Sequence, residues 1–182
     1  REVLLAGEEK TYDMIAKMLD FWSHNLRTKR IHVGMDEAHG LGRGRHQTLH
    51  GAEPESELMV RHLQKVSEMC AARGLKPMIW SDMFFRMTND AHEYYDFTSP
   101  FPAAVKRNMD KNVQLVYWDY NSREQTHYEE MIDGYREICD ETWFAGGLWS
   151  WCGFTPHNRF SIQTAKASMP ACVKKNVENI LF

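Results

Sequence analysis

Residues 30–37 read Arg30-Ile31-His32-Val33-Gly34-Met35-Asp36-Glu37, a short β-rich run that passes directly into two adjacent acids. A run of this kind, bounded by turn-forming residues, predicts a strand. A glycine-rich segment over residues 38–51 follows it and predicts an irregular loop. The two carboxylates are therefore expected where a strand ends and a loop begins.

The same pattern of strands and helices extends from this run in both directions. Before it, apolar residues at helical spacing predict a helix over residues 10–27. After the loop, Pro54 and the acidic residues behind it are typical of a helix start, and Gly74 is expected to end that helix. Further strands are predicted over residues 76–82, 113–120, 142–149 and 179–182. Further helices are predicted over residues 103–111, 124–140 and 158–175, and Pro170 is expected to interrupt or end the last of them. A long irregular connection is predicted over residues 83–100. Strands that alternate with helices favour a parallel sheet covered by helices.

Two architectures fit this alternation: part of an eight-stranded α/β barrel, and a five-stranded open doubly wound sheet. Four of the six tryptophans follow the ends of predicted strands, namely Trp80, Trp118, Trp149 and Trp151. Barrels collect functional side chains from the ends of many strands, whereas open sheets bind ligands at one switch point. We therefore predict an α/β fold of the (β/α)8 TIM barrel type, of which this chain covers about strands 4 to 8. Both ends read as cut, so residues 1–182 are expected to be part of a single catalytic barrel domain.

The composition is that of a globular protein, with 43% hydrophobic and 26% charged residues. The formal net charge of -3 argues against nucleic acid or an anionic membrane as the main partner. No apolar run approaches the length of a membrane span.

The cysteines carry little information about chemistry because no Cys-x-x-Cys spacing occurs. They are interpreted as buried free thiols, with a disulfide between Cys139 and Cys152 open as the alternative. Free thiols favour a reducing compartment, so a cytoplasmic location is expected.

Asp36 and Glu37 are the predicted catalytic residues, and solvated loop acids or helix N-caps are the alternative interpretation. Two adjacent carboxylates at the end of a strand repel each other. This repulsion helps one of them to keep a proton and act as an acid. Glycosidases that use two carboxylates place them about 5–5.5 Å apart or wider, on opposite sides of the sugar. Neighbouring residues at one strand end cannot easily straddle the anomeric carbon in this way.

If this pair cleaves a glycosidic bond alone, the nucleophile must come from elsewhere. The substrate can supply it through the carbonyl oxygen of its own 2-acetamido group. Glu37 would then protonate the leaving oxygen and later activate water. Asp36 would hold the acetamido N–H and offset the positive charge of the oxazolinium intermediate.

The run Ile31-His32-Val33-Gly34-Met35-Asp36-Glu37 resembles the strand-four signature of glycoside hydrolase family 20, the β-N-acetylhexosaminidases. Residues 38–45 resemble a subgroup without the usual accessory domains, and the resemblance extends through residues 77–82, 116–120 and 146–151. It implies a barrel whose first three strands, with a sugar-binding arginine, lie outside this chain. It also implies a retaining, substrate-assisted hydrolase of carbohydrate metabolism that needs no cofactor. The implied partner is a glycan or glycoconjugate that ends in an amino sugar.

The resemblance assigns substrate-binding roles at the later strand ends. Trp80 resembles a wall of the acetamido pocket, and Tyr117 or Tyr120 resembles the phenol that binds the acetamido oxygen, with Tyr120 slightly preferred. Trp118 and Asp119 would contact the sugar near its 4- and 6-hydroxyls.

Trp149 would form the floor of the pocket, and core packing is the alternative for each of these tryptophans. Many family members carry Trp-x-Glu at the last of these strands, but this sequence has Trp149-Ser150-Trp151. The preference between gluco and galacto sugars, to which Trp151 would contribute, therefore stays open. His32 either supports the carboxylates or packs in the core.

Other functions are alternatives to a substrate-assisted glycosidase. His46 and His50 are four residues apart, but no third ligand has convincing spacing, so we expect no metal site. A barrel glycosidase with a separate carboxylate nucleophile is an alternative, and Asp82 and Asp119 are its candidates. A non-catalytic carbohydrate-binding barrel and a metal-dependent hydrolase are further alternatives.

Overall fold

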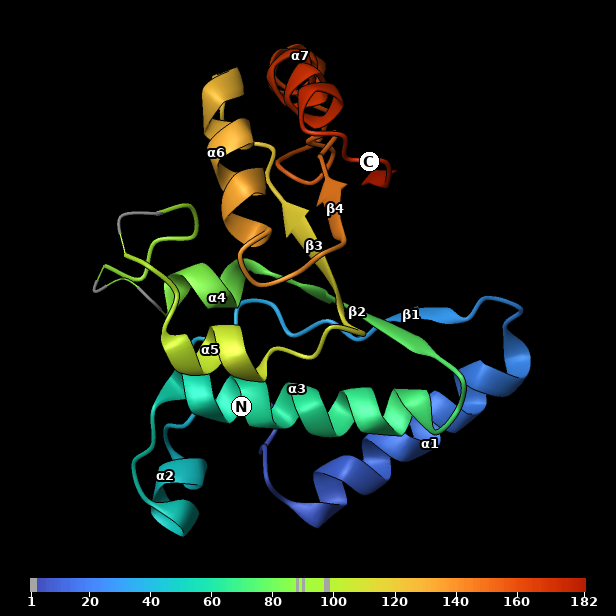
Figure 1. Cartoon of the computed structure of the whole chain (residues 1–182). Coiled ribbons are helices and arrows are strands. Elements are labelled where there is room, and N and C mark those ends of the chain that lie inside the picture. Colours follow the sequence, from blue (N-terminus) through green and yellow to red (C-terminus); the bar gives the residue numbers. More distant parts are fainter. Residues whose placement is uncertain (1–2, 88, 90, 97–98) are drawn as a thin grey trace. The chain divides into compact units, whose positions relative to one another are not determined.

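The computed structural model describes residues 3–87, 89, 91–96 and 99–182 (Figure 1). The chain divides into two compact units, residues 1–114 (unit 1) and residues 115–182 (unit 2). Each unit is built from parallel strands and the helices that connect them.

Unit 1 begins with two strands and the helices around them. Its elements are α1 (Glu9–Asn25), β1 (Arg30–His32), α2 (Arg45–His50), α3 (Glu55–Ala71), β2 (Lys76–Trp80), α4 (Asp82–Arg86) and α5 (Ala103–Asn108). The strands β1 and β2 are parallel, with Ile31 opposite Pro77. The hydrogen bonding continues past β1, because the Val33 N–H donates to the Met78 carbonyl at 2.9 Å and the Trp80 N–H to the Gly34 carbonyl at 3.0 Å. The end of β2 therefore fixes the backbone just before the two acids.

The core of unit 1 lies between α1, α3 and the strands, and α1 and α3 pack against each other (Figure 1). Its buried centre contains Leu19 of α1 with Val66 and Cys70 of α3. Val33 and Met35, from the segment after β1, pack on this cluster. Burial of these apolar side chains anchors the segment, which leaves the next residues, the acids, to face outward.

Unit 2 contains the later strands. Its elements are β3 (Gln114–Trp118), which starts at the boundary, α6 (Gln125–Tyr135), β4 (Thr142–Ala145), α7 (Asn158–Lys174) and β5 (Ile180–Leu181). The strand β4 is parallel to both β3 and β5. The helices α6 and α7 lie side by side (Figure 1). The core is aromatic: the fully buried rings of Tyr117, Tyr128, Tyr135 and Phe144 contact one another at centroid distances of 5.1 to 6.5 Å.

The prediction of a (β/α)8 TIM barrel, with this chain covering about strands 4 to 8, is wrong. The described residues form a small α/β fold with five parallel strands, in which β1 pairs on one side with β2 and β5 on one side with β4. Alternating strands and helices require parallel pairing, because each crossover helix returns the chain to the same end of the sheet. Closure is a separate condition, since each edge strand must find a second partner. Tryptophans at strand ends do not provide an edge strand with a second partner, so they do not indicate closure.

In the part of the chain that the structure describes, no helix is both long enough and apolar enough to cross a membrane. All four cysteines are free; Cys70, Cys139 and Cys172 are buried and Cys152 is exposed. Of the predicted irregular connection over residues 83–100, α4 occupies the beginning, and residues 88, 90, 97 and 98 lie outside the described residues.

Candidate active site

Asp36 and Glu37 lie in the irregular segment that follows β1, and both side chains are exposed. Gly34, Met35 and Glu37 all have left-handed backbone angles, with φ of +78°, +73° and +47°. Glycine adopts this conformation without strain, but for the other two it costs on the order of 1 kcal/mol each. Met35 is partly buried and packs against the core cluster of unit 1, and this contact holds the segment in place despite the cost. Strain of this kind collects at functional sites, because folding alone gains nothing from it.

Glu37 is held at both its backbone and its side chain. Its N–H donates to Oδ2 of Asp82 at 3.0 Å, and its Oε1 accepts a hydrogen bond from the Tyr94 hydroxyl at 3.1 Å. Asp82 begins α4 and is only 1% exposed. The carboxyl of Glu37 is therefore solvent-accessible but positioned, as the acid of a hydrolytic site needs to be.

Tyr94 has further neighbours. The Arg86 guanidinium carbon lies 4.6 Å from the centre of its ring, and His39 Nε2 lies 3.4 Å from its hydroxyl. Burial, followed by the hydrogen bond to Glu37 and the charge of Glu37, raises the pKa of Tyr94. The Tyr94 hydroxyl therefore keeps its proton and acts as a donor toward Glu37.

Asp36 has a different neighbour, His32. The Gly34 N–H donates to Nδ1 of His32 at 3.1 Å, so the neutral ring carries its proton on Nε2. This Nε2 is buried and meets no hydrogen-bond acceptor among the described residues. Burial lowers the pKa of His32, and the charge of Asp36 partly offsets that effect. His32 is therefore uncharged at neutral pH.

Trp80 completes the group in unit 1. It ends β2, and its ring lies against His32 at a centroid distance of 4.3 Å. A cavity of about 820 Å³ adjoins this group, and its lining includes His32, Met35 and Asp36. Its size is that of a ligand pocket. Most of the lining is apolar, with α1 as a large contributor, and Asp36 and His32 are among its few polar residues.

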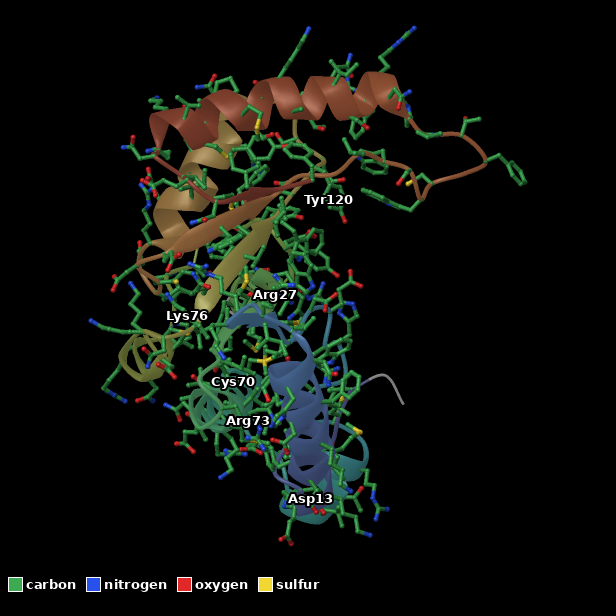
Figure 2. All side chains as sticks on the ribbon, turned by 90° about the vertical axis from the view of Figure 1, so that its right-hand side faces the viewer. Asp13, Arg27, Cys70, Arg73, Lys76 and Tyr120 are labelled. Atoms are coloured by element: carbon green, nitrogen blue, oxygen red, sulfur yellow. The ribbon has the colours of Figure 1, made fainter. Side chains whose placement is uncertain are left out.

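In unit 2, the predicted aromatic residues form a strand-end aromatic cluster, defined as Trp118, Tyr120, Trp149 and Trp151. Tyr120 stacks on Trp118 and meets Trp149 and Trp151 edge to face, at centroid distances of 5.6, 5.7 and 5.0 Å. The Trp149 indole N–H donates to the Tyr120 carbonyl at 2.7 Å. Figure 2 shows Tyr120 beside the loop that follows β4.

The loop after β4 fits closely around this cluster. A Cβ on Gly147 would lie 2.7 Å from ring atoms of both Trp151 and Tyr120. Trp149 adopts a left-handed backbone with φ of +44°. Trp151 stacks on Trp149 and is 54% exposed, so part of its surface is open to a ligand.

Tyr117 and Asp119 lie in the core of unit 2 and not on its surface. Tyr117 is 0% exposed and Asp119 is 1% exposed. Asp119 accepts from the Tyr117 hydroxyl at 2.8 Å, from His127 Nε2 at 2.7 Å and from the Asn121 N–H at 2.9 Å. Burial leaves neither side chain placed to touch a sugar, and of the two candidate phenols Tyr120 is the accessible one.

The structure thus groups the predicted residues within each unit. Unit 1 brings Asp36 and Glu37 together with His32 and Trp80, and unit 2 assembles the strand-end aromatic cluster above buried Tyr117 and Asp119. Sequence reasoning missed Tyr94, because it lies in the irregular connection where no periodic pattern marks it. It also missed His127, a single residue on the polar side of a helix.

The histidines in the glycine-rich segment have carboxylate partners. His46 is buried with its Nε2 2.5 Å from Oε1 of Glu53, and His50 Nε2 lies 3.0 Å from Oε1 of Glu8. No group of three or more metal-binding side chains occurs among the described residues. Each of these histidines therefore contacts one carboxylate.

No protein-family model matches this sequence, and no curated protein matches it significantly. Functional interpretation therefore depends on the geometry above and on the motif in residues 31–37.

Proposed function

We propose that this protein is an exo-glycosidase that hydrolyses terminal, non-reducing β-linked N-acetylglucosamine or N-acetylgalactosamine by a retaining, substrate-assisted mechanism. The observation that carries the proposal is the pair of adjacent, exposed carboxylates on a strained turn, each with a different neighbour. The resemblance of residues 31–37 to a family 20 signature supports it. The proposal does not depend on a barrel.

The different surroundings of the two acids suggest their roles. Glu37, whose Oε1 is held by Tyr94, gives its proton to the glycosidic oxygen as the bond from that oxygen to the anomeric carbon breaks. The acetamido oxygen of the substrate bonds to the anomeric carbon and forms an oxazolinium ion. Asp36, beside the uncharged His32, accepts the acetamido N–H and offsets the positive charge.

The second step regenerates the enzyme. Water attacks the anomeric carbon and loses its proton to Glu37, while the bond between that carbon and the acetamido oxygen breaks. Two displacements at one carbon give net retention. The product is the free amino sugar, and Glu37 is protonated again.

The strand-end aromatic cluster of unit 2 supports a sugar substrate independently. Aromatic rings suit the apolar C–H faces of a pyranose, and Trp and Tyr also offer polar edges. Trp151 offers accessible ring surface, and Tyr120 contacts the other three members of the cluster.

A mechanism with a separate carboxylate nucleophile has less support. Its candidates, Asp82 and Asp119, are each 1% exposed and already accept hydrogen bonds from protein groups. A nucleophile must reach the anomeric carbon, which these positions disfavour. A carbohydrate-binding protein without catalysis is a second alternative, and the experiment below separates it from the proposal.

The test is release of nitrophenol from the aryl β-N-acetylglucosaminide and galactosaminide by the full-length protein. Glu37→Gln is expected to lower kcat by about 10²- to 10⁴-fold, because it removes the acid while keeping the shape of the side chain. Asp13→Asn, an exposed acid on α1, is the matched control and should leave turnover unchanged. The ratio of the two wild-type rates gives the sugar preference.

Two outcomes would contradict the proposal. Absence of turnover in the wild type would favour a binding protein, and turnover that is indifferent to Glu37→Gln would assign the acid elsewhere. A thiazoline mimic of the oxazoline intermediate should inhibit the proposed mechanism and spare one with a separate nucleophile.

A further inference from the structure

Tyr94 contacts the proposed acid from a distant part of the sequence. Its hydroxyl donates to Oε1 of Glu37 at 3.1 Å across a separation of 57 residues. Among the described residues, no other group forms a hydrogen bond with the Glu37 carboxyl. The Tyr94 contact is therefore what orients this carboxyl.

The charged and titratable groups around this contact come from several elements. Arg86 of α4 lies on the face of the Tyr94 ring, and His39 lies near the hydroxyl. Asp82 adds a negative charge that acts on Tyr94 and accepts the Glu37 N–H. Asp36 is the neighbour of Glu37 in the chain. Arg86 alone in this group has a fixed positive charge, and its place on the ring face orients the ring.

A hydroxyl that donates to one carboxyl oxygen has two effects. It stabilises the ionised form of the carboxyl, since an ionised carboxylate is the better acceptor. It also occupies one oxygen, so that the proton used in catalysis is carried on the other, Oε2. A general acid must hold its proton in a defined direction toward the leaving oxygen.

We propose that Tyr94 is a positioning residue for Glu37, whose hydroxyl fixes the carboxyl through Oε1 and leaves Oε2 to serve the leaving-group oxygen. This inference rests on the proposed function of Glu37. Tyr94 itself exchanges no proton with the substrate. Its role is to set the direction of the carboxyl that does.

The kinetic test is Tyr94→Phe in the full-length protein, which removes the hydroxyl and keeps the ring on Arg86. We expect kcat to fall about tenfold with KM nearly unchanged, because the contact acts on the acid and not on substrate binding. The matched control is Tyr95→Phe, since Tyr95 is the adjacent tyrosine with its ring centre 6.1 Å from that of Tyr94. A purely structural role for Tyr94 would not confine the loss to kcat.

A second readout does not require activity. The difference between the tyrosinate absorbance titrations of the wild type and Tyr94→Phe isolates the ionisation of Tyr94. Because burial and Glu37 both raise the pKa of Tyr94, Glu37→Gln should move that ionisation to lower pH. If Tyr94 ionises at the same pH in Glu37→Gln as in the wild type, the contact is absent and the inference is overturned.

The outcomes separate the inference from the proposed function. If the wild type hydrolyses the substrates and Tyr94→Phe has the same kcat, the inference alone is overturned. If the wild type does not hydrolyse the substrates, the proposed function is overturned, and with it the positioning role of Tyr94 in catalysis. This holds even if Glu37→Gln shifts the ionisation of Tyr94.

Discussion

Acids follow the ends of β1 and β3, but their surroundings are opposite. Glu37 and Asp36 are exposed on a strained turn, and the Glu37 carboxyl has one hydrogen-bond donor. Asp119 is buried and accepts from three groups. An acid at the end of a parallel strand is thus not catalytic by position alone. Burial and the number of donors decide whether its charge is available to a substrate or is used to hold the fold together.

The two strand ends also differ in how they affect stability. The turn after β1 places two residues other than glycine in left-handed conformations, which costs free energy of folding. The end of β3 satisfies a buried charge with a phenol, an imidazole and a backbone N–H, which stabilises the folded state. Relief of the strain at Glu37 and loss of the Asp119 carboxylate should therefore change stability in opposite directions.

The largest expected effect is at Asp119. Asp119→Ala leaves the buried Tyr117 hydroxyl and the Asn121 N–H without this acceptor, so we expect a loss of about 3 kcal/mol of unfolding free energy. Asp36→Ala, at the other strand end, should change it by no more than about 0.5 kcal/mol. Urea denaturation followed by circular dichroism measures both. Equal effects of the two substitutions would remove the distinction between the strand ends.

The next effect concerns Gly147 and the strand-end aromatic cluster. Gly147→Ala places a Cβ 2.7 Å from rings of Tyr120 and Trp151, so the rings must move, and we expect a cost of about 1 to 3 kcal/mol. Gly153→Ala is the control, since its Cβ would meet nothing within 4 Å. Tryptophan fluorescence should change in the first variant and not in the second. If Gly147→Ala changes neither the unfolding free energy nor the tryptophan fluorescence, the loop adapts and the cluster is not tightly packed.

Most elements could be predicted from the sequence because their signals are local. Helical spacing over residues 10–27 and the helix start at Pro54 correspond to α1 and α3, within a few residues at each end. The strands are shorter than predicted, since pairing stops where the chain turns away. Pro170 does not end α7, which continues to Lys174 because the buried residues beside Pro170, Ala171 and Cys172 among them, pack that turn.

Non-local features could not be predicted in this way. The short helix α2 forms inside the glycine-rich segment, where His46 is buried against Glu53 seven residues later. Asp119 and Glu37 look alike in sequence, as acids directly after a strand. What separates them is contact with His127 and with Tyr94, which no local pattern encodes. Closure of the sheet likewise depends on partners of the edge strands and not on the alternation of elements.

A smaller effect, opposite in sign to that at Asp119, is expected at Glu37. Glu37→Gly relieves the left-handed backbone strain and should raise the unfolding free energy by about 0.5 to 1 kcal/mol, while abolishing hydrolysis. Asp36→Gly is the matched control, because Asp36 does not have a left-handed backbone, so the added chain entropy should make that variant less stable. Thermal unfolding of the three proteins compares them directly. A destabilised Glu37→Gly would show that the contacts of the side chain outweigh the strain.

The last expected effect is the pH dependence that His32 contributes to the stability of the segment after β1. Burial lowers the pKa of His32 below its ordinary value of 6.5, so below that pH the unfolded chain binds a proton that the folded chain excludes. Stability is therefore complete above pH 6.5 and falls as the pH drops through it, by at most about 1.4 kcal/mol per pH unit for one site. Replacing the imidazole in His32→Phe should flatten this dependence, although buried His62, whose pKa is also lowered, leaves part of it. His24→Gln, at an exposed position on α1, should retain the full slope. An unchanged slope in His32→Phe would mean that this imidazole is solvated, and Asp36 would then lack the uncharged neighbour that the proposed mechanism gives it.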